Sequence, residues 1–203
     1  MRRSPVYTYT MSPIIPTLTR QSIVPSLLTT ERLILRQWQD SDREPFARLN
    51  ADPQVREFFP GRLTRDESDA SVSGFRKGIE ERGWGFWAVE VRGGAPFIGF
   101  VGLSVPSFRP CVEIGWRLAR EHWGYGYASE AALASLRFGF EKLTLEEIVA
   151  FTVPLNERSR RVMERIGMSR DPADDFDHPK IEPGHPLRRH VLYRMKRSDW
   201  EQL

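Results

Sequence analysis

Residues 112–131 read Val-Glu-Ile-Gly-Trp-Arg-Leu-Ala-Arg-Glu-His-Trp-Gly-Tyr-Gly-Tyr-Ala-Ser-Glu-Ala, and this stretch decides the fold. Its first eight residues alternate in polarity, which predicts a strand over 112–119. Gly124 and Gly126 precede a helix expected to reach about Glu141. A helix N-terminus leaves backbone N–H groups unpaired, and glycine lets an anion approach them. The pattern therefore predicts a phosphate or pyrophosphate site, although a tight turn of purely structural importance would use the same glycines.

A dinucleotide-binding oxidoreductase is a rival interpretation of this turn. It requires Gly-x-Gly-x-x-Gly directly after a strand and an acidic residue about 20 positions later, where Glu147 happens to lie. However, Ser129 replaces the third glycine, and the charged segment 120–123 separates strand from turn. The strands before the turn also resemble hairpins rather than βαβ units, so this interpretation ranks lower.

On both sides of this stretch, the spacing of the apolar residues alternates between the period of two that is typical of strands and the period that is typical of helices. Residues 86–92 and 97–103 alternate on either side of a glycine-proline turn, which predicts a hairpin. Strands are also expected at 33–38, 147–153 and 190–196.

Capping signals predict three further helices. Ser41 with Glu44 forms one capping-box pattern, and Thr64 with Glu67 forms another whose helix Gly83 ends. A third helix is expected between Asn156 as its N-cap and Gly167 as its stop. The order of elements predicts a mixed α/β (α+β) domain, in which helices flank a largely antiparallel sheet. We expect this single domain to span residues 28–203 and residues 1–27 to form a flexible tail.

The net charge of +3 comes entirely from the N-terminal region. Residues 1–30 contain three arginines and no acid, so residues 31–203 are neutral overall. A neutral body lacks the basic face that nucleic acids require. No apolar run approaches the roughly 18 residues of a membrane helix, and four prolines in the tail oppose a transit-peptide helix. The single cysteine, Cys111, favours the reducing cytoplasm.

Four segments, in order along the chain, resemble motifs of the GNAT acetyltransferases, in particular the ribosomal-protein-alanine N-acetyltransferase-like branch. They are Leu28-Thr29-Thr30-Glu31-Arg32-Leu33-Ile34-Leu35-Arg36, Val112-Glu113-Ile114-Gly115-Trp116, Trp123-Gly124-Tyr125-Gly126-Tyr127-Ala128-Ser129-Glu130-Ala131, and Asn156-x-x-Ser159 through Ile166-Gly167-Met168. The resemblance implies a GNAT fold and acetyl-CoA as cosubstrate, whose pyrophosphate suits the anion site inferred above.

The resemblance also implies roles for individual residues. Backbone N–H groups of Trp123, Gly124, Tyr125, Gly126, Tyr127 and Ala128 would hold the pyrophosphate, and the backbone of Trp116, Arg117 and Leu118 would pair with the pantetheine arm. Asn156 would bind the pantetheine, and Ser159 would lie near the sulfur. The family motif has Gln or Arg where this chain has Glu121. We therefore expect Glu121 to turn away and Arg117 or Arg120 to supply any side-chain charge.

Acetyl transfer to an amine requires a base and a donor for the leaving thiolate. Glu113 is the candidate base, with a solvated strand carboxylate as the alternative explanation. Ser159 or Tyr193 is the candidate acid, whereas Cys111 has no visible base and is not expected to be a nucleophile.

The segment 169–189 has four prolines and no periodicity, and long connections of this kind are often functional. We hypothesise that its acidic part attracts a cationic amine, with a solvated loop or dimer contact as the alternative. The acidic residues are Asp171, Asp174, Asp175 and Asp177. Three histidines accompany them (His178, His185 and His190), but their spacing matches no metal-ligand pattern, so no metal is expected.

The sequence thus predicts an acetyl-CoA-dependent N-acetyltransferase, monomeric or homodimeric, that acts on an amine of a small molecule or a protein N-terminus. A non-catalytic acyl-CoA-binding module of the same fold is the alternative.

Overall fold

The structure is a computed structural model that describes residues 27–203, so the predicted tail lies outside the described residues except for Leu27. Its strands are β1 (Leu28–Thr29), β2 (Leu33–Arg36), β3 (Phe86–Val91), β4 (Gly99–Ser104), β5 (Glu113–Leu118), β6 (Glu147–Thr152), β7 (Ser169–Arg170), β8 (Phe176–Asp177) and β9 (Arg189–Lys196). Its α-helices are α1 (Arg43–Ala51), α2 (Arg65–Arg82), α3 (Tyr127–Glu141), α4 (Glu157–Arg165) and α5 (Arg197–Trp200).

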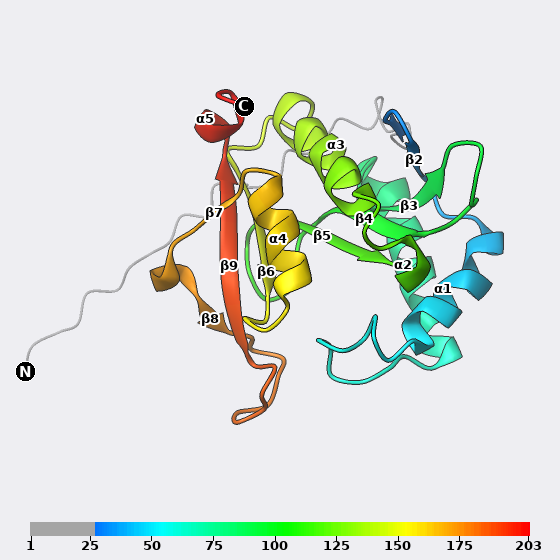
Figure 1. The fold of residues 1–203 in the computed structure, drawn as a ribbon, viewed down its shortest axis with the longest axis horizontal. Helices are drawn as coiled ribbons and strands as arrows, with labels where there is room; N and C mark the ends of the chain where they lie inside the picture. The colour runs from blue at the N-terminus through cyan, green and yellow to red at the C-terminus, as the bar shows by residue number, and fades with distance from the viewer. Residues whose placement is uncertain (1–26) are drawn as a thin grey trace, which may run out of the picture.

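The strands form one sheet in the order β1-β2-β3-β4-β5-β6-β9-β7, with β8 pairing to β9 (Figure 1). Every pairing is antiparallel except that of β5 with β6. The predicted hairpin is the β3–β4 pair, in which Trp87 faces Val101. The predicted architecture, a largely antiparallel sheet flanked by helices, is confirmed.

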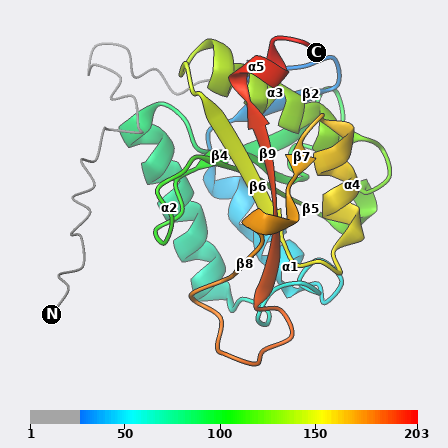
Figure 2. The ribbon, with the colours of Figure 1, turned by 90° about the vertical axis from the view of Figure 1, so that its left-hand side faces the viewer.

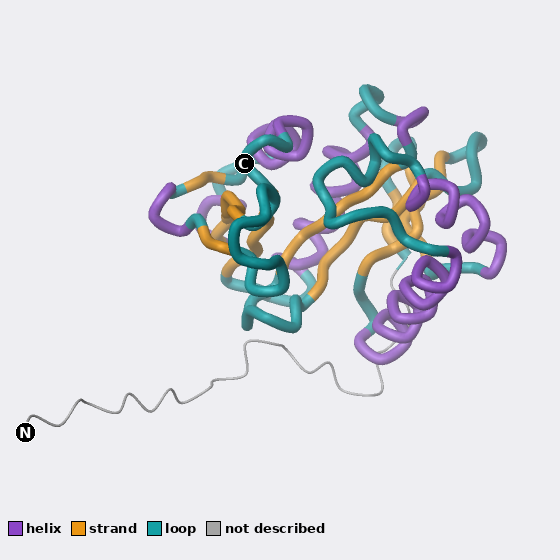
Figure 3. The backbone as a smooth tube through the Cα atoms, turned by 90° about the horizontal axis from the view of Figure 1, so that it is seen from below, coloured by secondary structure: helices purple, strands orange, loops and turns teal. Residues whose placement is uncertain are grey.

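Helices cover both faces of the sheet, and the aromatic side chains show which helix covers which face. The Phe75 ring of α2 lies 5.3 Å from the rings of Phe86 and Phe100 on one face. The Phe138 ring of α3 lies 5.5 Å from Trp87 on the other. Figure 2 shows α2 and α4 on opposite sides of the strands, and Figure 3 shows helices outside the strands. None of the helices in residues 27–203 is both long and apolar enough to cross a membrane.

The second capping box forms as predicted, whereas the first prediction is wrong. Thr64 accepts the N–H of Glu67, Glu67 accepts that of Thr64, and Gly83 ends α2 in the left-handed region at φ 80°. Ser41, in contrast, lies inside a 3₁₀ turn over Asp40–Asp42, and α1 begins after it. The reason is Asp42, whose buried carboxylate binds Arg36 and the N–H of Gln39, so this side chain tightens the chain before the helix starts.

The segment 169–189 contains more regular structure than its sequence indicates. Two short strands, β7 and β8, pair with β9. The aspartates bind within the same region: Asp174 pairs with Arg194, Asp175 with Arg170, and Asp177 with Arg188 and Arg189. Asp171 caps the turn at Ala173. These carboxylates therefore neutralise neighbouring arginines rather than forming an open acidic surface.

Glu130, in the first turn of α3, connects that helix to the N-terminal strands. Its carboxylate accepts hydrogen bonds from the Thr30 hydroxyl (2.6 Å), the Arg32 N–H (2.9 Å) and Arg32 Nε (2.6 Å). A carboxylate in the first helical turn also interacts favourably with the helix dipole. Partial burial opposes ionisation, but the bonds from Thr30 and Arg32 prevail and lower the pKa of Glu130.

We predict that Glu130→Gln lowers the free energy of unfolding by about 1–2 kcal/mol, because hydrogen bonds to a charged group are lost. The loss is no larger because Arg32, its ion-pair partner, is half-exposed and solvent weakens the pair. Since the folded-state pKa lies below the unfolded value of 4.5, the stabilisation is complete above pH 4.5 and is lost as pH falls through the folded pKa. Urea denaturation across this range measures the difference. Glu141→Gln, which removes an exposed partner of Arg137 on the same helix, is the control and should change little.

Candidate functional site

The site lies where β5 and β6 separate. Their parallel ladder contains one residue pair, Glu113 with Val149, and beyond it the two strands diverge (Figure 1). On its other edge β5 remains paired with β4, and the Ala119 N–H donates to Ile98 on that side. Because backbone groups alternate in direction along a strand, those of Trp116 and Leu118 face the gap. The open sheet therefore presents an unpaired strand edge at this point.

A cleft of about 790 Å³ occupies this gap. The predicted site residues that line it are Glu113, Trp116, Arg117, Leu118, Trp123, Gly124, Gly126, Tyr127, Ala128, Asn156 and Ser159. Tyr125 does not line the cleft; its side chain is 61% exposed and stacks on Tyr127 with ring centres 5.6 Å apart. The fold thus brings together residues that are 46 positions apart in the chain.

The glycine turn presents a row of free donors to the cleft. Gly124 (φ 83°) and Gly126 (φ 81°) both adopt the left-handed region that favours glycine. Within residues 27–203, the backbone N–H groups of 124–129 have no acceptor, and the buried Ser129 hydroxyl has no partner. A Cβ atom at Gly124 would meet open space. These donors at the N-terminus of α3 fit a bound phosphate or pyrophosphate.

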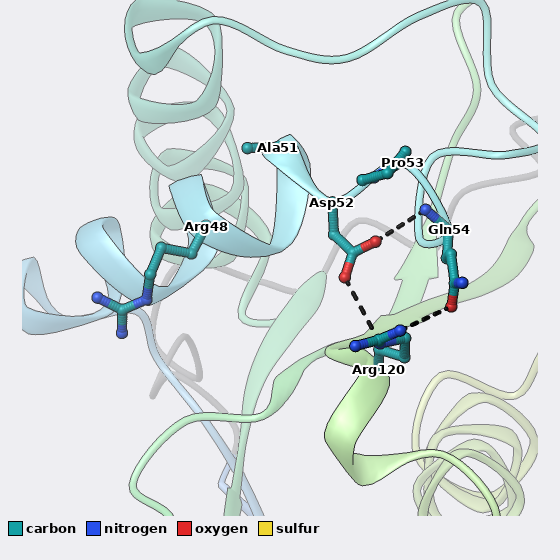
Figure 4. Close-up of a pocket in the computed structure, with 6 residues that line it drawn as sticks. All are labelled: Arg48, Ala51, Asp52, Pro53, Gln54 and Arg120. Carbon is teal, nitrogen blue, oxygen red and sulfur yellow. Dashed lines mark hydrogen bonds and ion pairs between the residues drawn. The ribbon is translucent and has the colours of Figure 1, made fainter.

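The expectation that Arg117 or Arg120 supplies charge to this turn is wrong. Arg120 lies against the end of α1, where Gln54 accepts from it at 3.1 Å and Asp52 lies 3.9 Å away (Figure 4). Arg117 extends from the sheet face that α2 covers, whereas α3 packs on the other. Glu121 is exposed and does not line the cleft.

Helix α4 supplies positive charge that the sequence analysis missed. Arg158, Arg161 and Arg165 all line the cleft, and the Arg158 guanidinium lies 4.6 Å from the Trp123 ring centre beside the glycine turn. The concentration of arginine over 157–165 could have indicated this. From the sequence, only the start of this helix, at Asn156 and Ser159, was expected to contribute to the site.

The start of α4 is held by its predicted cap. The Asn156 side chain accepts the N–H of Ser159 at 3.2 Å and donates to the Thr152 hydroxyl at 3.0 Å. The Ser159 side chain faces the cleft region, whereas Tyr193, the other candidate acid, is buried and donates to Glu164 at 2.8 Å. Of the two candidates, the structure brings only Ser159 to the cleft.

Glu113 stands at the closed end of the gap, as the last residue paired with β6. Burial raises the pKa of its carboxyl group, although the Ser104 hydroxyl, donating at 2.6 Å, opposes this effect. A carboxyl group with a raised pKa is a better proton acceptor near neutral pH. The position and environment of Glu113 therefore suit a general base.

The part of segment 169–189 that borders the cleft is not its acidic part. His178, Lys180 and Ile181 line the cleft, and none of the four aspartates does. The rings of His178 and His190 lie 5.0 Å apart, and burial lowers the pKa of both. Among the described residues, no group of three or more His, Cys, Asp and Glu side chains is arranged to hold a metal ion.

Comparisons with known proteins show a family. Residues 32–169 match the acetyltransferase (GNAT) domain. The chain is 32% identical over 174 residues to the uncharacterized N-acetyltransferase YnaD of Bacillus subtilis, covering 85% of this chain and 98% of that one. It is 28% identical to the [ribosomal protein uS5]-alanine N-acetyltransferase of Escherichia coli, covering 89% and 96%. A GNAT-family acetyltransferase structure from Bacillus anthracis superposes with a TM-score of 0.72 at 28% identity, covering 85% and 99%.

The Cys111 thiol should be nearly inert, as expected of a residue without a catalytic base. Burial raises its pKa from 9.0 to about 11. At pH 8 its thiolate fraction is then about 100-fold below that of an ordinary thiol. We predict a correspondingly slow reaction with Ellman's reagent, compared with the same protein unfolded in urea. Equal rates in the folded and unfolded protein would contradict this.

Proposed function

Because this chain belongs to the GNAT acetyltransferase family, we propose that it is an acetyl-CoA-dependent N-acetyltransferase that transfers the acetyl group directly to a primary amine. The observation that carries the proposal is the row of free N–H groups over 124–129, at the mouth of a gap between two strands. GNAT acetyltransferases use acetyl-CoA, which presents a pyrophosphate and an extended amide-containing arm. Both parts match the chemistry of this cleft.

Most of the predicted residues then have a binding role. The backbone N–H groups of 124–128 hold the pyrophosphate, whereas the N–H of Trp123 already donates to the Arg120 carbonyl. Arg158, Arg161 and Arg165 add positive charge nearby. The backbone of Trp116 and Leu118 pairs with the pantetheine arm as an additional strand would, and Asn156 binds the same arm. This arrangement orients the bound thioester, which supplies the activated acetyl group, toward the closed end of the gap.

Glu113 accepts the amine proton, directly or through a water molecule, so that the neutral amine attacks. A backbone N–H that β5 presents to the gap stabilises the developing oxyanion, and Ser159 protonates the departing thiolate. No covalent enzyme intermediate is needed, which agrees with the raised pKa of Cys111.

The acceptor is an amine of a small molecule or of a protein N-terminus. The Escherichia coli relative named above acts on the alanine of a ribosomal protein, which makes a protein N-terminus one candidate class. The single cysteine suits a reducing compartment, so we propose a cytoplasmic location. The proposal includes no metal and leaves open a monomer or homodimer.

Acetyl-CoA binding is tested at Gly124, where a larger side chain has space and where asparagine and aspartate tolerate the left-handed backbone. We predict that Gly124→Asp weakens acetyl-CoA binding at least about 10-fold, because a carboxylate would lie beside the pyrophosphate. Gly124→Asn is the isosteric neutral control and should retain most of the affinity. Thermal shift and calorimetric titration measure both. No stabilisation of the wild-type protein by acetyl-CoA would refute the proposal.

Catalysis is tested at Glu113. We predict that Glu113→Gln lowers kcat at least about 100-fold, as expected for a lost general base, while acetyl-CoA affinity is unchanged. Release of free CoA with a panel of amines is the measurement. Wild-type activity in the variant would remove Glu113 from the mechanism, and wild-type protein that binds acetyl-CoA but releases no CoA with any amine would indicate the non-catalytic module.

The pH profile gives a second measurement of the same role. Activity should fall as pH decreases through the Glu113 pKa, which burial places above 4.5. Ser104→Ala removes the hydrogen bond that stabilises the carboxylate and should move this limb to higher pH.

A further inference from the structure

Arg117 is a half-buried cation without a carboxylate partner among the described residues. Its Nη1 donates to the Asn50 side chain at 2.8 Å, and its guanidinium lies 4.3 Å from the Phe59 ring and 5.3 Å from the Phe100 ring. Its Nε is buried and has no acceptor among the described residues. Within residues 27–203, no acidic side chain lies within ion-pair distance of it. One edge of the guanidinium therefore lacks the partner that a buried arginine requires.

A second arginine increases this imbalance. Arg56 is 9% exposed, donates to the Gly61 carbonyl and contacts the same Phe59 ring at 4.4 Å. Burial and the positive charge of Arg56 lower the pKa of Arg117 to about 9. Two guanidinium groups thus share one aromatic ring near the cleft.

Another arginine of the same domain, Arg36, has its charge neutralised by carboxylates. Arg36 is more deeply buried than Arg117, at 8% exposed, and it forms ion pairs with both Asp42 and Glu90. Arg117 projects from the sheet face that also carries Glu113, four residues earlier on β5, and it lines the cleft. Arg117 thus differs from Arg36 in having no carboxylate partner, and from both Arg36 and Arg56 in lining the cleft.

The rest of this side of the cleft is aromatic and poor in acid. The phenylalanines that line it from α2, β3, β4 and the segment after α1 are Phe58, Phe59, Phe75, Phe86 and Phe100. Among the described lining residues, Glu113 is the one carboxylate, and Lys180 is a further cation, from segment 169–189. Such a surface disfavours a polycationic amine and accommodates an apolar molecule that bears a negative group.

We propose that Arg117 binds a carboxylate of the acceptor, so that the acceptor combines a primary amine, an apolar body and a carboxylate, as an amino acid does. This inference rests on the proposed acetyl transfer. A carboxylate in the cleft beside Arg117 would give the guanidinium an anionic partner and neutralise its charge through charge-assisted hydrogen bonds. The amine end then lies toward Glu113 and the thioester.

The binding experiment uses the full chain with CoA bound, and its probes are 3-phenylpropionate and 3-phenylpropionamide, which differ only in charge. Calorimetric titration should show the carboxylate binding about 10-fold or more tightly to the wild-type protein. Arg117→Met should abolish this preference. Lys180→Met, which removes another cation that lines the cleft, should retain it. Equal affinity of the two probes for the wild-type protein, or a preference that persists in Arg117→Met, would overturn the proposal.

Turnover supplies the second measurement, with L-phenylalanine against L-phenylalaninamide and 6-aminohexanoate against its amide. Arg117→Met should lower kcat/KM for the carboxylate members and leave the amides nearly unchanged, and Arg117→Lys should restore part of the difference because it keeps the charge but not the planar guanidinium. Equal loss for both members would overturn the proposal. Because the titration does not require turnover, failure of acetyl transfer would appear separately from failure of carboxylate recognition.

Stability distinguishes the proposed role from a structural one. Removing an unpaired buried charge should leave the Tm of Arg117→Met unchanged or raise it. A large fall in Tm together with a preserved preference for the carboxylate probe would identify Arg117 as a packing residue instead.

Discussion

The separation of β5 from β6 is the constraint on which the rest of the molecule depends. Each strand is paired over six residues on its outer side, β5 with β4 and β6 with β9, but they share a single pair with each other. Strands that diverge after one pair leave backbone groups without ladder partners. In a closed sheet these groups would be satisfied internally and no cleft would exist. The candidate site is therefore a region where the sheet leaves its own hydrogen bonding incomplete.

The glycine turn lies at the mouth of this gap because distant segments hold it there. Trp123 donates to the Leu118 carbonyl at the end of β5, and Glu130 binds Thr30 and Arg32 from the N-terminal strands. The N-terminal motif and the glycine motif, about a hundred residues apart, thus meet in one contact network. Glu113 occupies the opposite, closed end, where burial changes its acidity. The same opening of the sheet therefore places both the free N–H groups of the glycine turn and the Glu113 carboxyl group.

Local patterns predicted the elements well, because the interactions that decide them are short. The Thr64 cap, the Gly83 and Gly167 stops and the Asn156 cap depend on groups within a few residues. Prediction failed where a distant partner intervened. Ser41 does not cap α1, because the neighbouring Asp42 binds the buried Arg36 and the N–H of Gln39, and these bonds hold Ser41 inside a turn that precedes the helix. The aspartates of 171–177 looked like a free acidic surface, because the arginines that pair with Asp174 and Asp177 lie on β9 or beside it.

The sequence by itself determined the periods, caps and glycine turn, and with them the fold class, the family resemblance and the prediction of an anion site made of backbone donors. Only the tertiary structure decided which charges reach that site and which do not. Arg117 lies on β5 and Arg120 follows two residues after its end, yet the first enters the aromatic side of the cleft and the second binds at the end of α1. The physical reason is that a side chain's direction follows from its own strand, whereas its electrostatic environment depends on helices and loops that pack there from elsewhere in the chain.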